Sequence, residues 1–423
     1  MNGHITVNRR CSRTWLAAGL ALALAAPALA NGFRNPPEGA NALGRAGGKI
    51  ATIDDASAVT HNPANLMDLT NATALAALTI ARSKTEFTSP LGPTAETDNP
   101  WALLPNMFGV LPVGREWTFG LGVTTPFGQA TKWPDDSFFR YTAPYEAQVV
   151  VVNVNPVAAT RIGKQLYLAL GMDVYVSDLT LKQFFPWSAL LMSPALPDGR
   201  AEFSGDGVGY GLNAALTWKI TDAQRLGLTV RTPVRVDYDG HFTVNNVPPP
   251  ALMMGVQARS DFSTRIDYPA TIGLGYGIRL LETVQLGVDV EWVNFSQFDQ
   301  LPLDIGPDNV LLPARTIPEQ WNDSWTCGFG LDWQFLPGWV VRGGYVFLQS
   351  PVPDDTLAPT LPDTDTHVMT LGLGYRHGRH AVDLGYALNF YEDRTIADSY
   401  NPAYNGKYET SSQLISVSYG ISF

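Results

Sequence analysis

The amino-acid sequence predicts an all-β transmembrane fold: a 14-stranded antiparallel outer-membrane β-barrel with a small N-terminal hatch, or plug, inside it. Three observations lead to this prediction. The first residues read as an export signal, yet no later apolar run approaches the roughly 18–20 residues of a membrane-spanning helix. Apolar and polar residues alternate along most of the remaining chain. Short and long connections also alternate between these segments.

Residues 1–30 are expected to form a signal peptide that is cleaved after Ala30. Arg9, Arg10 and Arg13 form a basic region, an apolar run follows, and Ala28-Leu29-Ala30 supplies the small-x-small pattern of a cleavage site. The apolar run is too short to span a membrane comfortably. A cleaved signal is therefore favoured over an N-terminal anchor.

Composition limits the kinds of partner and site. The chain has a net charge of −11, whereas nucleic acid attracts basic surfaces, so we expect no nucleic-acid partner. Cys327 is the only cysteine after the predicted signal, which excludes an intramolecular disulfide in the mature chain. The histidines are scattered and show no metal-ligand spacing. We therefore expect neither a metal nor another cofactor.

The C-terminal segment shows the alternation clearly. Ile415, Val417, Tyr419, Ile421 and Phe423 fall on one face, and small polar residues fall on the other. A soluble β-sandwich also alternates, but several segments here are longer than the usual strand of about five or six residues. The terminal Phe423 resembles the signal by which outer-membrane barrels are recognised by their assembly machinery. Outer-membrane lipids are expected to surround the apolar face.

Counting the alternating segments gives fourteen strands over residues 73–423. The number is even, as in bacterial barrels with short periplasmic turns and long extracellular loops. Residues 31–72 do not alternate and mix apolar residues with turn formers, so they predict a packed hatch and not a disordered tail. The expected strands cover residues 73–87, 101–112, 116–125, 144–160, 165–182, 205–220, 225–240, 261–280, 283–298, 319–335, 338–349, 366–377, 380–394 and 409–423.

Several short motifs resemble one family. Gly32-Phe33, Asp54-Asp55-Ala56-Ser57 and Asn62-Pro63-Ala64 are similar to the N-terminal hatch of the FadL family, and Leu104-Pro105-Asn106-Met107 and Phe295-Ser296-Gln297-Phe298 extend the resemblance along the chain. The resemblance implies an outer-membrane transporter of Gram-negative bacteria for long-chain fatty acids or other hydrophobic compounds. It also implies a fourteen-stranded barrel closed by a hatch. The hatch residues are then Gly32, Phe33, Asp54, Asp55, Asn62, Pro63 and Ala64.

Two of the long links, 183–204 and 241–260, carry apolar clusters. Extracellular loops are normally polar, so exposed apolar surface there indicates contact with hydrophobic ligands, and methionine adapts to ligands of varied shape. The resemblance implies a groove for initial capture. The alternative is a lid in which the two loops pack on each other. The residues expected in the groove are Phe184, Phe185, Trp187, Leu190, Leu191, Met192, Leu252, Met253 and Met254.

The third expected strand ends in Thr124-Thr125-Pro126-Phe127-Gly128. Pro126 cannot donate a ladder hydrogen bond, and Gly128 permits a bend. The resemblance implies an inward kink at Pro126, Phe127 and Gly128 that opens a gap in the wall for lateral release of a ligand into the bilayer. The alternative is a strand that ends at Pro126.

Strand parity places charged residues on the inward face of the predicted barrel. Arg231 and Arg235 are expected there, four residues apart, where an arginine fork could hold a fatty-acid carboxylate. Other inward charges, such as Asp173, Asp237 and Arg342, are expected to pair with one another.

The function expected from these features is uptake of hydrophobic compounds, without enzymatic activity. Capture on the apolar loops is followed by binding in the lumen against the hatch and by lateral release. One alternative is an aromatic-hydrocarbon importer of the same fold. Two others are a general diffusion porin, which the plug and the apolar loops disfavour, and an outer-membrane lipase, for which the sequence lacks a Gly-x-Ser-x-Gly motif.

Overall fold

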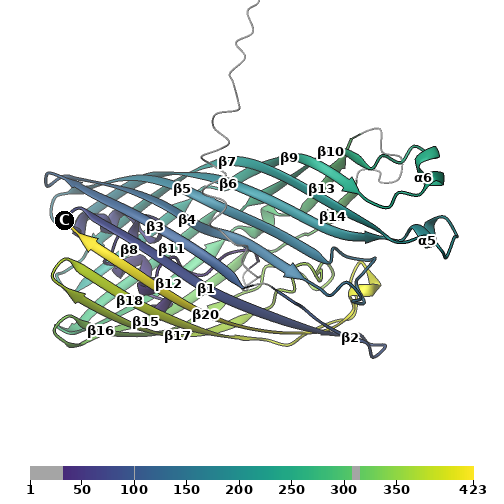
Figure 1. Cartoon of the computed structure of the whole chain (residues 1–423). Coiled ribbons are helices and arrows are strands. Elements are labelled where there is room, and N and C mark those ends of the chain that lie inside the picture. Colours follow the sequence, from purple (N-terminus) through teal and green to yellow (C-terminus); the bar gives the residue numbers. More distant parts are fainter. Residues whose placement is uncertain (1–31, 100, 307–314) are drawn as a thin grey trace, which may run out of the picture.

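The structure, a computed structural model, describes residues 32–99, 101–306 and 315–423 as a closed antiparallel barrel (Figure 1). The predicted signal peptide lies outside the described residues. Strand β1 (Thr73–Thr88) pairs with β3 (Ala102–Val113) on one side and with β20 (Gly406–Ser422) on the other, so the first and last strands close the ring. The barrel has 14 strands, which confirms the predicted fold class. Among the described residues, no helix is long and apolar enough to cross a membrane.

Most strands keep the predicted order and nearly the predicted bounds. Short strands β2 (Thr94–Glu96), β13 (Gln300–Ile305), β14 (Arg315–Pro318) and β19 (Arg394–Ile396) extend the sheet beyond the barrel strands at the end with the long loops. The remaining strands of the wall are β4 (Trp117–Lys132), β5 (Glu146–Ile162), β6 (Leu166–Phe185), β7 (Gly199–Lys219), β8 (Gln224–Arg231), β9 (Val234–Val244), β10 (Arg259–Tyr268), β11 (Thr271–Leu281), β12 (Val284–Val293), β15 (Ser324–Leu336), β16 (Trp339–Leu348), β17 (Thr366–His377) and β18 (His380–Tyr391).

Two of the predicted strands are each divided in two by proline. The seventh is interrupted at Thr232-Pro233 between β8 and β9, and the eighth at Pro269-Ala270 between β10 and β11. Proline has no backbone N–H to donate to the ladder. Across each interruption the buried, inward side chains change parity: Gly227 faces inward before the first break, but Val234 and Val236 do so after it.

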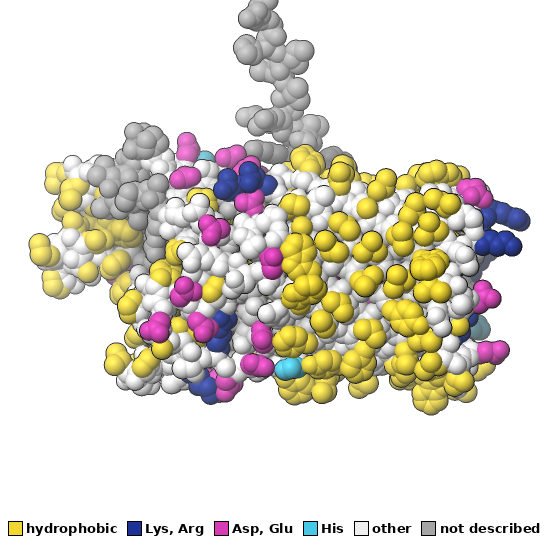
Figure 2. All heavy atoms as spheres, turned by 180° about the vertical axis from the view of Figure 1, so that it is seen from behind, with side chains coloured by type: hydrophobic (Ala, Val, Ile, Leu, Met, Phe, Trp, Pro, Cys, Tyr) yellow, Lys and Arg dark blue, Asp and Glu magenta, His cyan; other side chains and the backbone are white. Residues whose placement is uncertain are grey.

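The outward face is apolar over the half of the barrel that lies next to the short turns (Figure 2). Side chains such as Leu170, Leu371 and Ile415 are exposed there, whereas charged side chains gather beyond this band and at the turns. An apolar outer surface flanked by aromatic residues is the pattern of an outer-membrane barrel. Trp333 and Phe390 contribute exposed aromatic rings to this face.

Residues 32–69 lie inside the barrel. Helix α2 (Ala40–Arg45) contacts β15 to β18 and β20, α3 (Lys49–Thr52) contacts β8, β11 and β12, and the 3-10 helix η1 (Pro63–Asp68) contacts β4 to β7. Helix α4 (Ala58–His61) contacts β4 and β5. The segment therefore crosses the lumen and touches opposite walls.

Glycine permits the closest of these contacts. A methyl group added at Gly344 of β16 would overlap the carbonyl oxygen of Arg45 at the end of α2. Gly48 approaches Gly287 of β12 so closely that an added methyl group would lie 2.7 Å from its Cα atom. Side chains on either backbone would keep the segment away from the wall.

Replacing Gly344 by Ala is expected to weaken docking of residues 32–69, because the added methyl group has no room beside Arg45. Overpacking of this kind costs about 1–3 kcal/mol. Urea titration in lipid vesicles would measure the free energy of unfolding, and limited proteolysis would report release of the segment.

The neighbouring Gly343 supplies the matched control. A methyl group there would lie 3.6 Å from the nearest backbone oxygen, that of Thr370, in ordinary contact. Gly343→Ala should therefore leave both measurements close to those of the unchanged protein. Equal effects of the two substitutions would contradict the proposed close docking.

Candidate functional site

A cavity of about 140 Å³ lies in the lumen between residues 34–63 and the inner wall. Pro126 and Phe127 of β4 form one part of its lining, and Tyr175 of β6 lies beside them. Polar and charged side chains line one part of it: Arg34, Asn35, Glu38, Lys49, His61, Asn213, Arg231 and Glu291. Apolar side chains line another: Leu43, Ala46, Val346, Leu348, Val368, Ala387 and Leu414.

Strand β4 is irregular around Pro126, and this point is called the kink below. Its ladder with β3 ends at the pair Met107 and Val123, whereas its ladder with β5 continues to Lys132. The register with β5 shifts between Thr124 and Phe127, which places one additional residue in β4. The alternative in which the strand ends at Pro126 is therefore wrong.

At the kink, the N-terminal segment replaces β3 as the hydrogen-bond partner of the β4 backbone. Asn35 donates its backbone N–H to the oxygen of Pro126 at 2.9 Å, and Gly128 donates to the oxygen of Phe33 at 2.9 Å. Thr125 donates its backbone N–H to the side chain of Asn106 in β3 at 3.1 Å. Between β3 and β4, hydrogen bonds to the Asn106 side chain and to residues 33 and 35 thus replace the regular ladder.

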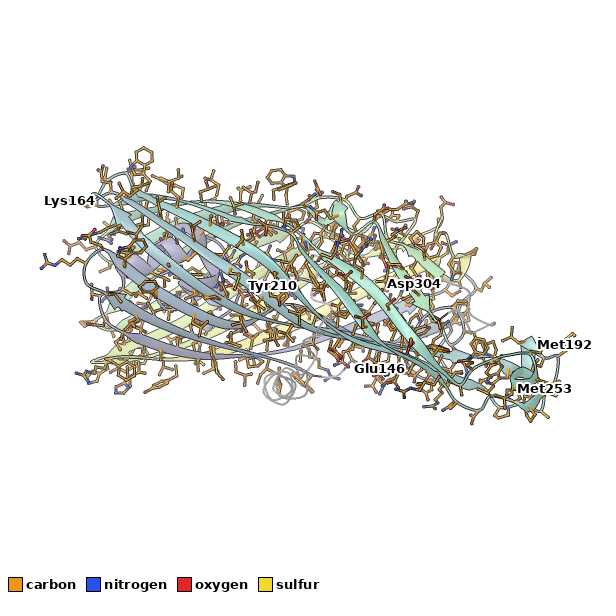
Figure 3. All side chains as sticks on the ribbon, turned by 90° about the horizontal axis from the view of Figure 1, so that it is seen from above. Glu146, Lys164, Met192, Tyr210, Met253 and Asp304 are labelled. Carbon is orange, nitrogen blue, oxygen red and sulfur yellow. The ribbon has the colours of Figure 1, made fainter. Side chains whose placement is uncertain are left out.

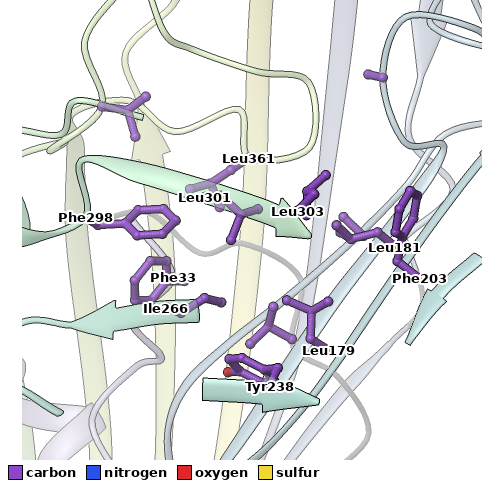
Figure 4. Packing of buried hydrophobic residues seen from close by; sticks show 14 of the residues in the cluster. Phe33, Leu179, Leu181, Phe203, Tyr238, Ile266, Phe298, Leu301, Leu303 and Leu361 are labelled. Carbon is purple, nitrogen blue, oxygen red and sulfur yellow. The ribbon is translucent and has the colours of Figure 1, made fainter. Parts of the chain in front are cut away.

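Phe33 contacts five aromatic rings, among them that of Phe127 at the kink. Figure 4 shows it beside Phe298. The ring centre of Phe33 lies 5.1 Å from that of Trp321 and between 5.3 and 5.8 Å from those of four further rings. The preceding Gly32 donates its N–H to the Asp363 carboxylate at 3.0 Å, and burial raises the pKa of Asp363 to about 6. The four further rings belong to Phe127, Tyr268, Phe295 and Phe298.

The other predicted hatch residues hold the segment in shape. Asp54 accepts from both terminal nitrogens of Arg376 at 3.1 Å, and Asp55 accepts from the backbone N–H of Ser57 at 2.8 Å. Burial acts to raise the pKa of Asp54, but the arginines around it, Arg376 first, lower the pKa well below its usual value. Asn62 accepts from the N–H of Ala64 at 3.0 Å, and Pro63 begins η1.

The predicted carboxylate site is not formed. Arg231 faces the lumen, but it pairs with Asp173 and donates to the oxygen of Thr60 at 2.7 Å. Arg235 lies on the outer surface, where its side chain is 59% exposed and pairs with Asp267 at 2.8 Å. The parity change at Thr232-Pro233 separates them, so the expectation of two inward arginines is wrong, and Asp237 also faces outward.

The two apolar loops form neighbouring tips at the end opposite the short turns. Helix α5 (Trp187–Leu190) lies on one loop and α6 (Pro249–Met253) on the other, and Figure 3 shows Met192 and Met253 close together at these tips. The loops also bond to each other, since Asn246 donates to the oxygen of Asp198 at 3.0 Å.

Only part of the predicted capture groove is exposed. Phe184 and Trp187 are buried, and the partly buried Phe185 and Leu191 pack against the core that includes Trp187, so these four stabilise the loops more than they form exposed surface. The side chains of the set that are at least half exposed are Leu190, Met192, Leu252, Met253 and Met254.

A second cavity, which sequence reasoning missed, lies within the same end of the barrel. Its volume is about 450 Å³, and apolar side chains from β6, β7, β13 and β14 form much of its lining. Burial raises the pKa of Glu319, which also lines it, to about 8. The apolar lining residues include Leu181, Phe203, Leu301, Leu303, Ile305 and Ile317.

Comparison with known proteins agrees with this architecture. A family model described as outer membrane protein transport protein (OMPP1/FadL/TodX) matches residues 21–423. The chain belongs to this family. It is therefore an outer-membrane protein, and neither the family description nor those of the relatives below name an enzyme.

The relatives are distant but cover nearly the whole chain. A long-chain fatty acid transport protein of Salmonella typhi is 24% identical, over 88% of this chain and 90% of the relative. A putative outer membrane protein of Neisseria meningitidis is 25% identical, with 97% and 98% covered.

Solved structures show the same fold. A FadL homologue of Pseudomonas aeruginosa has a TM-score of 0.82 at 21% identity, covering 93% of this chain and 100% of that one. The toluene transporter TodX of P. putida has a TM-score of 0.72 at 16% identity, covering 91% and 98%.

Acidification is expected to loosen the plug at His61. Burial lowers the pKa of His61 to about 4, from 6.5, so the folded protein binds fewer protons than the unfolded chain between these values. The contribution of His61 to stability is therefore full above pH 6.5 and is lost as the pH falls towards 4. Hydrogen exchange of residues 58–69 at pH 7 and pH 5, corrected for the intrinsic rate, would measure this change.

His61→Gln keeps an N–H for the Glu38 carbonyl, which His61 contacts at 3.0 Å, but does not titrate. It should remove most of the pH response. His377→Gln, at a short turn, should retain the response. An unchanged response in His61→Gln would assign the effect to another group.

Proposed function

We propose that this protein carries hydrophobic compounds across the outer membrane by capture on the loops, binding in the lumen and lateral release. The observation that supports this route best is the lumenal cavity beside the kink, since Pro126 and Phe127 belong both to its lining and to the interrupted wall. Relatives described as transporting long-chain fatty acids or toluene support the class of cargo.

The route begins on the exposed loop residues around Met192 and Met253. From there, the largely apolar cavity near Leu301 and Leu303 offers an intermediate site. The lumenal cavity follows, and Pro126 and Phe127 of the kink belong to its lining. At each stage apolar side chains replace water around the cargo, which favours transfer of an apolar molecule.

The plug distinguishes this function from that of a general diffusion porin. Residues 40–68 contact opposite walls of the barrel, whereas a porin keeps a water-filled lumen. A lipase of the serine type would need a histidine beside its serine nucleophile. His367 and His380 instead contact the hydroxyl groups of Tyr345 and Tyr419, at 2.6 and 2.7 Å, so these two histidines give the lipase alternative no support.

Deleting Pro126 is expected to block lateral release. The deletion removes the one additional residue of β4, so a regular ladder can form and straighten the strand. Uptake of tritiated oleate or toluene should fall about tenfold or more, equivalent to at least about 1.4 kcal/mol. Cells without another member of this family would be used for the measurement.

Pro126→Ala is the matched control, because it removes the ring but keeps the additional residue. Its uptake should stay close to that of the unchanged protein. Normal uptake by the deletion variant, with correct membrane insertion, would show that the cargo leaves by another route.

Replacing Met192, Leu252 and Met253 by Ser is expected to impair capture. The loss of apolar contact should raise the concentration for half-maximal uptake about tenfold, with little change in the maximal rate. Concentration-dependent initial rates would separate these two quantities.

Leu91 offers a control, since it is 86% exposed in the β1–β2 loop but is not part of the α5 and α6 tips. Leu91→Ser should leave the uptake curve unchanged. Equal shifts in both variants would indicate a general surface effect instead of a capture site.

A further inference from the structure

Each described cation around the lumenal cavity is already paired with an acidic side chain of the protein. From this balance we infer that the cargo held in the cavity is uncharged, such as a hydrocarbon, an alcohol or a phenol, and is not a carboxylate. The inference rests on the proposed function and names the class of compound that the same cavity takes.

Each described cation in the lining has an acidic partner. Arg34 pairs with Glu291, and Lys49 lies 3.8 Å from Asp289. Arg231 pairs with Asp173. An arginine already paired with a buried carboxylate has little affinity left for a second one, because the new partner would have to displace the first.

An additional acid makes the balance slightly negative. Glu38 lines the cavity, and its carboxylate lies 4.0 Å from His61. Burial lowers the pKa of His61 to about 4, so His61 is neutral at neutral pH and does not offset the charge. The three lining cations therefore face four acids: Glu38, Asp173, Asp289 and Glu291.

A carboxylate that entered the cavity would lose its water without gaining a free cation. Removing an ion from water without a partner is strongly unfavourable. An uncharged compound avoids this loss and can still contact Leu43, Leu348 and Leu414 on the apolar side. The second predicted arginine does not alter the balance, since Arg235 is on the outer surface.

The decisive comparison uses two probes of equal chain length, dodecan-1-ol and dodecanoate, at pH 8. Binding of each radiolabelled probe to the purified protein in lipid nanodiscs would be corrected with empty nanodiscs. We expect the alcohol to bind about tenfold more tightly than the carboxylate, or better. Equal binding, or tighter binding of dodecanoate, would overturn the inference.

A second experiment removes the acidic partner of one cation in the cavity lining. Glu291→Gln leaves Arg34 without its carboxylate, so the affinity for dodecanoate relative to dodecanol should rise about tenfold. Asp267→Asn releases Arg235 on the outer surface and should not change this ratio. A ratio that rises equally in both variants, or in neither, would contradict the assignment.

If neither probe binds to the unchanged protein above the level of empty nanodiscs, the proposed function itself is wrong and this inference falls with it. If both probes bind and dodecanoate is preferred, only the inference about charge is wrong.

Discussion

Backbone hydrogen bonds must be completed within the protein wherever it faces lipid, because the hydrocarbon core of a bilayer offers no partners. The closed ring of strands meets this demand almost everywhere. At the kink of β4 it does not, and there Phe33 and Asn35 of the N-terminal segment bond to the backbone of Pro126 and Gly128. Residues 33–35 therefore supply backbone partners to the wall where the strand ladder does not. Because Asn35 and Pro126 both bond to each other and line the cavity, the cavity, the kink and the N-terminal segment are in direct contact.

Two features allow close packing inside the lumen. Glycines on the segment and on the wall allow backbones to touch, as Arg45 and Gly344 do. Charged side chains enter in pairs, for example Arg342 with Asp383 at 2.6 Å, because a lone buried charge is costly. The cavity remains between the segment and the wall, and it is lined both by paired charges, such as Arg34 with Glu291, and by apolar residues such as Leu43 and Leu414.

The fold was predictable because alternation and turn spacing are local signals that repeat along each strand. The strand order, the number of strands and the inward position of Arg231 follow from them. The outward position of Arg235 does not, since parity counting fails across the break at Pro233. The pairing of Arg231 with Asp173 and the rings around Phe33 depend on residues distant in sequence. No local pattern contains that information.

Residues 33–35 and helix α2 of the N-terminal segment are held to the wall by different kinds of contact. Around α2, close backbone contacts and the buried pair of Arg45 with Asp332 hold the segment to β15 and β16. At the kink, two backbone hydrogen bonds, a third from the Asn35 side chain to the oxygen of Thr125, and aromatic contacts hold Phe33 and Asn35. Aromatic contacts are non-polar and can be exchanged for contacts with an apolar cargo at little cost. The Arg34–Glu291 pair and the hydrogen bond from Gly32 to Asp363 hold the same stretch of chain, so both also oppose its release from the kink. The contacts of α2 with β15 and β16 are separate from this set.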